Sequence, residues 1–367
     1  MNTRILAIAA ALCAARLQAQ SVTSLPEVSP AASVSQVVGI SSVKVVYHRP
    51  SVNKRRIWGD LVPYGFTNQG FGTSKAAPWR AGANENTLVT FQDDVSVAGK
   101  ALKAGTYGLS MALAPDGGVT VIFSTDTTAW GSFFYDPSAD ALRATTRMED
   151  APYTEQLRYQ FDNVTANSAD LALYWESKRI PVPLRFDTDR IVEDRLKEEL
   201  HGSRGFVYQA WVEGSQYLLD HDRDLPLALT WADTSVSAPF IGERNFATLS
   251  NKSLILEKLG RKAEADQVMD GAIKIGSPTD IHAYARHLLQ IGDRDRAVAT
   301  FKLNARLHPG AWPVDYGLAR AYSAMGDYKG ATEALLRAQQ ALPEGDVANA
   351  AAIKINLEKL RKGEDIN

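Results

Sequence analysis

The feature that most constrains the fold is a repeat of small residues in the second half of the chain. Three glycines recur at intervals of 32 and 34 residues, and an alanine follows each of them after five residues. These positions are Gly260, Gly292 and Gly326, with Ala265, Ala297 and Ala331. A small side chain lets two antiparallel helices approach closely, and glycine adopts the positive φ that a tight turn needs. The pattern predicts helix pairs stacked into a solenoid.

Prolines support the same interpretation. Pro309 and Pro343 follow the second and third glycines by 17 residues, where proline ends the second helix of a pair. The spacing resembles that of tetratricopeptide repeats, whose unit is about 34 residues. The unit around Gly260 is degenerate, because Arg261 replaces the usual acidic residue and the proline comes late, at Pro278. We expect a tetratricopeptide-like α-helical domain over residues 191–362, with the helices between 191 and 240 as worn repeats or a connector.

The first half of the chain has a different period. Between residues 33 and 187, apolar and polar residues alternate and turn residues interrupt them at short intervals, which is typical of antiparallel strands. The clearest case is a hairpin over residues 107–123, whose turn is Pro115-Asp116-Gly117-Gly118. About eight short strands are expected. They predict an antiparallel β-sandwich or β-barrel, so the chain is a β module followed by an α module.

The amino terminus predicts export. Residues 1–19 have the order of a secretory signal peptide, with Arg4, an apolar run and small residues ending at Ala19, after which we expect cleavage. The apolar run is shorter than the roughly 20 residues that span a bilayer, so no transmembrane segment is expected. Cys13 is the only cysteine and leaves with this segment, which excludes disulfides and thiolate chemistry from the mature protein. The predicted location is the periplasm or the exterior.

Several blocks of the β half are similar to an uncharacterised family of exported bacterial domains, frequent in gliding and soil bacteria, that carries only a domain-of-unknown-function label. The blocks are Tyr47–Ser51, Ile57–Gly59, Leu61–Gly65, Trp79–Glu85, Ala104–Tyr107 and Trp130–Tyr135. Longer members resemble this chain to its end, including a tail like Gly363–Asn367, although they often carry Lys where Glu364 stands. The resemblance implies the two-module architecture and export, and no activity comes with it.

Polar and aromatic residues concentrate between positions 47 and 85. The candidate ligand-binding residues are Tyr47, His48, Arg49, Trp58, Trp79, Arg80, Asn84 and Glu85. Arginines recognise carboxylates or phosphates, aromatic rings offer flat faces to sugars or peptides, and His48 with Glu85 could act as an acid and base pair. The alternative is structural: Arg49 or Arg80 pairs with Glu85 inside the sandwich, and the tryptophans fill its core or cover an edge.

Other site chemistries have little support in the sequence. The six histidines lack the spacing of zinc sites, and the glycine-rich stretch at 70–75 lacks that of a phosphate loop, so neither a metal nor a cofactor is expected. With 40 basic and 42 acidic residues, the chain offers no electrostatic footprint for nucleic acid. Oligomeric state and catalysis are left open.

The predicted function is that of an adaptor. A protein or peptide partner in the cell envelope would bind in the groove that curved helical repeats present. The alternative is a small-ligand or carbohydrate-binding protein or a hydrolase, with its site in the β domain around Arg49 and Glu85.

Overall fold

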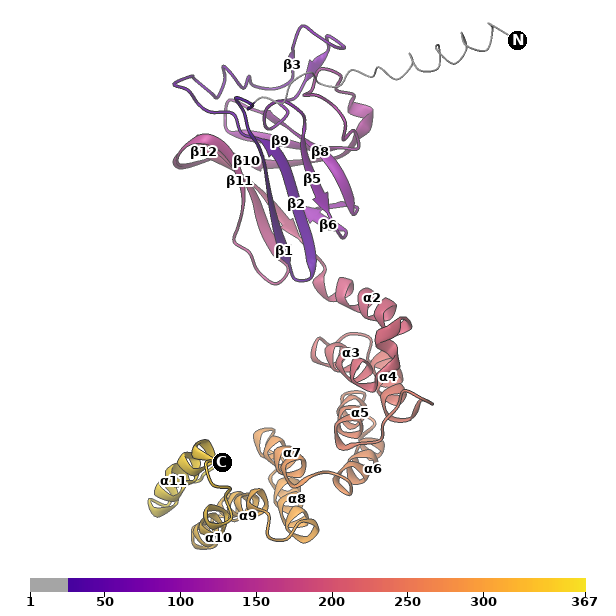
Figure 1. The fold of residues 1–367 in the computed structure, drawn as a ribbon, viewed down its shortest axis with the longest axis vertical. Helices are drawn as coiled ribbons and strands as arrows, with labels where there is room; N and C mark the ends of the chain where they lie inside the picture. Colours follow the sequence, from indigo (N-terminus) through magenta and orange to yellow (C-terminus); the bar gives the residue numbers. More distant parts are fainter. Residues whose placement is uncertain (1–25) are drawn as a thin grey trace, which may run out of the picture. The chain divides into compact units, whose positions relative to one another are not determined.

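The computed structural model describes residues 26–367, so the signal peptide predicted at residues 1–19 lies outside the described residues. The chain divides into two compact units, one ending at Val192 and the other running from Glu193 to Asn367. Strands make up most of the first unit and helices make up the second (Figure 1). This confirms the predicted order of a β module followed by an α module.

The first unit contains two main antiparallel sheets. The larger has six strands in the order β1-β2-β5-β8-β9-β10, the smaller has four in the order β11-β12-β6-β7, and β3 and β4 form a separate ribbon. The strands are β1 (Ala31–Val38), β2 (Ser41–His48), β3 (Thr67–Asn68), β4 (Ala76–Ala77), β5 (Thr87–Phe91), β6 (Val95–Val97), β7 (Lys100–Leu102), β8 (Gly105–Leu113), β9 (Gly118–Ser124), β10 (Asp140–Arg147), β11 (Glu149–Asp162) and β12 (Ser168–Arg185).

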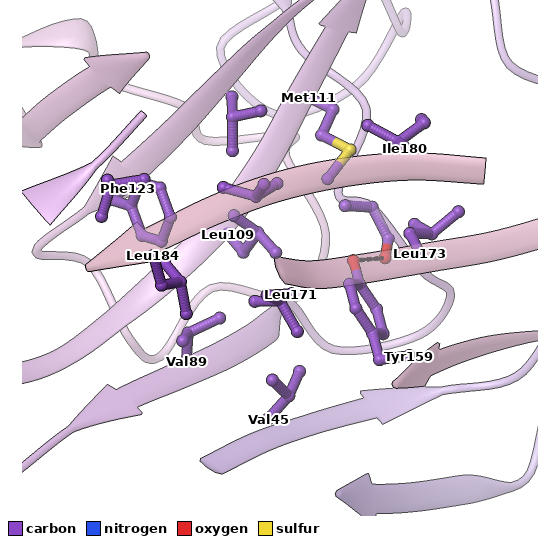
Figure 2. Packing of buried hydrophobic residues seen from close by; sticks show 14 of the residues in the cluster. Val45, Val89, Leu109, Met111, Phe123, Tyr159, Leu171, Leu173, Ile180 and Leu184 are labelled. Carbon is purple, nitrogen blue, oxygen red and sulfur yellow. Dashed lines mark hydrogen bonds between the residues drawn. The ribbon is translucent and has the colours of Figure 1, made fainter. Parts of the chain in front are cut away.

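The two sheets bury one shared apolar core, as expected for a β-sandwich. Leu109 of β8 and Phe123 of β9 enter it from the larger sheet, and Leu171 and Leu173 of β12 enter it from the smaller (Figure 2). The hairpin predicted over residues 107–123 is present as β8 and β9, with Gly117 at a φ of +86° in its turn. Twelve strands are described where about eight were expected, because strands of two or three residues are too short to show alternation.

The second unit consists of helical hairpins. Its helices pack in the pairs α3/α4, α5/α6, α7/α8 and α9/α10, and α4 packs on α5, α8 on α9 and α10 on α11. The helices are α2 (Thr188–His201), α3 (Tyr208–Asp220), α4 (Leu225–Ser237), α5 (Phe246–Lys258), α6 (Lys262–Ile273), α7 (Pro278–Gln290), α8 (Arg294–Leu307), α9 (Trp312–Ala324), α10 (Tyr328–Gln340) and α11 (Val347–Arg361). In the part of the chain that is described, every helix is too short or too polar to cross a bilayer.

The repeat positions occupy the places that their spacing indicates. The turns between paired helices contain Gly260, Gly292 and Gly326, with φ of +76°, +85° and +80°. The second helices contain Ala265, Ala297 and Ala331, each at most 3% exposed. Pro309 and Pro343 come shortly after α8 and α10 end. The prediction of stacked helix pairs is therefore confirmed.

Helix capping and turn conformation explain why the unit around Gly260 departs from the repeat pattern and why the helices between residues 191 and 240 were hard to assign. The side chains of Asp293 and Asp327 cap α8 and α10 by accepting a backbone N–H, whereas Arg261 gives α6 no side-chain cap. The helices α3 and α4 form a further hairpin, whose turn places Asp222 at a φ of +52° instead of a glycine. The helices α3 and α4 thus pair as the helices of the recognised repeats do.

Candidate functional sites

The aromatic members of the candidate set in the β domain belong to its core. Tyr47 is buried, and its ring packs edge-on against Tyr159 with centroids 4.8 Å apart. Trp79 stacks on Trp175 at 6.0 Å, and Trp58 packs edge-on against both rings. The structural alternative, in which the tryptophans fill the core, describes these residues well.

The polar members around His48 do meet. The imidazole Nε2 of His48 lies 3.4 Å from Glu85 Oε2 and 3.2 Å from Glu27 Oε2. Asn84 donates a hydrogen bond of 3.0 Å to the same oxygen of Glu27. A proton on Nε2 would therefore lie between two carboxylates, an arrangement that suits proton transfer or recognition of a cation. Glu27 was not predicted, because it precedes the region of strand alternation.

The two arginines of the candidate set bind backbone carbonyls. Arg49 Nε donates to the carbonyl of Leu157 at 3.0 Å, which ties β2 to β11. Arg80 donates to the carbonyl of Asn84 at 2.6 Å, and its guanidinium lies 5.3 Å from the ring centroids of both Trp130 and Phe133. Burial lowers the pKa of Arg80 from its usual value. Neither arginine takes the predicted pairing with Glu85, whose partner is His48.

Two cavities of the β domain lie away from this cluster. One of 610 Å³ lies between the loop at Gly65–Phe66 and strands β8, β9 and β10, and another of 420 Å³ adjoins it at Phe66. The second is lined by Phe66, Lys75, Ala76, Tyr135, Asp136, Pro137 and Arg143. Sequence reasoning missed these residues, because most of them lie in loops without periodicity and they come from distant parts of the chain.

The walls of the second cavity are held by a hydrogen-bonded triad. Asp140 Oδ2 accepts from Tyr135 Oη and from Arg143 Nε, both at 2.7 Å, and Arg143 also donates to Tyr135 Oη at 2.8 Å. Burial, together with the hydrogen bond to Asp140, raises the pKa of Tyr135 to about 12. The phenol is therefore neutral at physiological pH and serves to orient its neighbours. Among residues 26–367 no group of three or more His, Cys, Asp or Glu side chains is arranged so that it could hold a metal ion.

The helical unit presents a different surface. We call the exposed side of α3, α5, α7, α9 and α11 the first-helix face, because the first four open the hairpins. Mostly buried side chains join some of these helices: Asn251 donates to Ser215 at 2.7 Å, His282 stacks on Tyr316 at 5.7 Å, and Asn356 donates to Tyr316 at 2.7 Å. These contacts link α3 to α5, α7 to α9 and α9 to α11.

A cavity of 110 Å³ opens on this face between α7 and α9. We call it the α7–α9 cavity; it is lined by Arg286, Leu289, Gln290, Arg320 and Asn367. Arg320 is only 9% exposed, burial lowers its pKa, and its Nε atom is buried without a hydrogen-bond partner. The salt bridges described for residues 26–367 involve neither arginine, and the charge of Asp365 acts on Arg320 by raising its pKa against the larger effect of burial. The cavity therefore has two arginine side chains in its lining and one buried donor, Arg320 Nε, without a partner.

Comparisons with known proteins give one family match and several similar solved structures. Residues 29–184 match the model of a family described as a protein of unknown function (DUF2911). Among solved structures, the C-terminal part of a tetratricopeptide repeat-containing protein from Cytophaga hutchinsonii is 14% identical, with 48% of this chain and 66% of that chain covered and a TM-score of 0.32. A thermophilic tetratricopeptide-repeat protein from Thermus thermophilus is 17% identical, with 48% and 89% covered and a TM-score of 0.31. A search of curated proteins finds no match.

Proposed function

We propose that the repeats carry the activity, because residues 29–184 match the model of a family of unknown function, DUF2911, and the second unit is built of tetratricopeptide-like helix pairs. The protein is exported and binds a protein or peptide partner in the cell envelope through its first-helix face. The β domain then positions the array or binds a second ligand.

The α7–α9 cavity is the observation that carries this proposal. Protein interiors seldom hold an arginine without an acidic partner, because removing its charge from water is costly. Arg320 is nevertheless buried beside the exposed Arg286, and Leu289 adds an apolar wall. A partner segment that brings an acceptor group to these arginines would satisfy the unpartnered Arg320 Nε and gain specificity.

Capture of a partner with matched charge reversals tests the proposal. The full mature chain, Arg286→Glu and Arg306→Glu are immobilised in parallel and exposed to envelope extract from the native organism. Both arginines are exposed and belong to the same hairpin, but Arg306 lies on the second helix, α8. Arg286→Glu is expected to lose a retained protein that Arg306→Glu keeps. Equal retention by both variants would contradict the proposal.

Export rests on the signal-peptide pattern of residues 1–19. Expression of the full chain in a bacterial host, followed by fractionation and amino-terminal sequencing, is expected to place the mature protein outside the cytoplasm and beginning at Gln20. A cytoplasmic protein that retains Met1 would refute this part.

A ligand-binding or hydrolytic β domain is the second candidate function. It is favoured by the two carboxylates at His48 and by the 420 Å³ cavity at Phe66, which has the size of small-molecule sites. Arg49 and Glu85 do not share a hydrogen-bonded cluster, so the predicted centre at those two residues is replaced by His48 with Glu27 and Glu85. Screening glycans and small acids for a shift in the melting temperature of the wild type, but not of His48→Gln or Phe66→Ala, tests it.

A further inference from the structure

The segment after α11 folds back onto the helical array. Gly363, with a φ of +73°, reverses the chain, and Ile366 then enters the apolar cluster formed by α9, α10 and α11. Its side chain is only 4% exposed and joins a cluster that includes Leu357 and Leu360 of α11. Asp365 and Asn367 on either side of it are exposed. One aliphatic side chain therefore anchors a short extended segment.

Side chains of α9 bind the backbone of this segment. Ser323 Oγ accepts from the backbone N–H of Ile366 at 3.1 Å, and Arg320 Nη1 donates to the carbonyl of Ile366 at 3.0 Å. Ser323 also donates to Asp365 Oδ1 at 2.6 Å, and Asn367 Nδ2 donates to the carbonyl of Arg320 at 3.1 Å. Both backbone groups of Ile366 are thus held by side chains, which is how a groove holds a peptide ligand.

The binding surface extends beyond the segment. Asn367 lies at the rim of the α7–α9 cavity, whose other walls are Arg286, Leu289, Gln290 and Arg320. Arg320 therefore serves both places, since one of its nitrogens holds the segment while Nε remains without a partner. The site accommodates a longer ligand than the three residues that occupy it.

We propose that Asp365–Asn367 is the resting occupant of a peptide site on α9 and α11, and that the partner is a protein with an extended segment of the same chemistry. That segment carries an aliphatic residue between an acidic residue and a polar one, and it continues into the α7–α9 cavity. The partner displaces the chain's own segment. The inference rests on the proposed function and names both the partner chemistry and the competitor at that surface.

Removing residues 365–367 should therefore increase the affinity of the protein for a peptide of the same chemistry. A tethered segment competes at an effective concentration of about 1 mM, so an untethered peptide binds poorly while it is in place. The probe is a fluorescein-labelled peptide with the sequence of residues 360–367, titrated by anisotropy into the full mature chain and into a chain truncated after Glu364. We expect the truncated chain to bind at least tenfold more tightly.

Peptide variants define the recognition. Ile366→Ser in the peptide is expected to reduce affinity for the truncated chain at least tenfold, because the anchoring side chain is lost. Glu364→Lys in the peptide is the matched control and leaves affinity unchanged, because Glu364 is exposed. Equal affinities for the Ile366→Ser peptide and the wild-type peptide would overturn the assigned anchor.

Circular dichroism shows whether the helical array still folds when the segment Asp365–Asn367 is released, and so separates a structural role of the segment from a competitive one. Truncation uncovers part of an apolar cluster, so the full-length Ile366→Ser variant is tested beside it as a second way to release the segment. A folded truncated or Ile366→Ser protein that leaves the peptide unbound at 1 mM overturns the proposal. Unfolding of both proteins also overturns it, since the segment is then an integral part of the array.

The peptide titration and the partner capture can fail independently of each other. If Arg286→Glu loses a captured partner and the peptide does not bind, the array binds its partner but the segment does not compete for that site. If the peptide binds and capture fails, the site exists and the proposed partner binding is wrong.

Discussion

Lowering the pH from 7 to 5 should destabilise the helical array through His282 of α7. The imidazole Nδ1 donates to the carbonyl of Pro313 at 2.9 Å, while the ring stacks on Tyr316 and packs edge-on against Phe301. Burial lowers the pKa of His282 from 6.5 to about 4, and the neighbouring charges of Arg320 and Arg286 act in the same direction. The folded array therefore holds this histidine neutral well below the pH at which an unfolded chain protonates it.

The sign and size of the effect follow from linkage. Above pH 6.5 both states are neutral and full stability is present; as the pH falls, the unfolded chain gains a proton that the folded array does not. With pKa values of 6.5 unfolded and about 4 folded, the free energy of unfolding falls by about 2 kcal/mol between pH 7 and pH 5. Further loss stops near pH 4, where the folded array also protonates.

Urea unfolding followed by circular dichroism at 222 nm measures this loss. His282→Gln retains an amide donor near Pro313 and does not titrate, so its loss between pH 7 and pH 5 should be smaller than that of the wild type by about 2 kcal/mol. His287 is exposed on the same helix, and His287→Gln should behave as the wild type does. Equal pH dependence in the wild type and His282→Gln would refute the reasoning.

Three further predictions concern packing, and urea unfolding measures each. Ala331→Leu overfills the fully buried contact between α9 and α10 and should cost about 1–3 kcal/mol; no loss would mean that the small residue is not needed there. Gly326→Ala should cost about 1 kcal/mol, because φ is +80° although the space around it is open, and an unchanged midpoint would contradict this. Trp79→Ala should cost about 3 kcal/mol in the β domain by removing the ring stacked on Trp175, with Trp79→Phe less damaging; a stable Trp79→Ala would favour a ligand role.

The repeat array could be predicted because its information is local. A glycine in each turn, an alanine five residues later and a proline after the second helix each respond to a constraint within one hairpin. Ala297 and Ala331 are accordingly fully buried, as their spacing indicated. The hairpin α3/α4 was harder to recognise, since Asp222 adopts the turn conformation that glycine adopts elsewhere.

The candidate sites depend on contacts between distant segments, which periodicity does not encode. Glu27 reaches His48 from a segment ahead of β1, and Tyr135 meets Phe66 across two separate loops. Ile366 docks on α9 after a reversal at Gly363, a position that belongs to no repeat. Arginines and aromatic residues lie close together in the sequence between positions 47 and 85. In the fold the rings of the candidate aromatic residues belong to the core, Arg49 binds a backbone carbonyl, and Arg80 lies against a pair of aromatic rings.

Site-specific photocrosslinking tests the central claim, that the first-helix face binds the partner, most directly. p-Benzoylphenylalanine replaces Gln290 at the α7–α9 cavity in one full-length variant and Arg306 on α8 in another, and both are irradiated in the native cells. We predict a discrete crosslinked protein from position 290 and none from position 306. Crosslinks from position 306 alone, or identical products from both positions, would contradict the account.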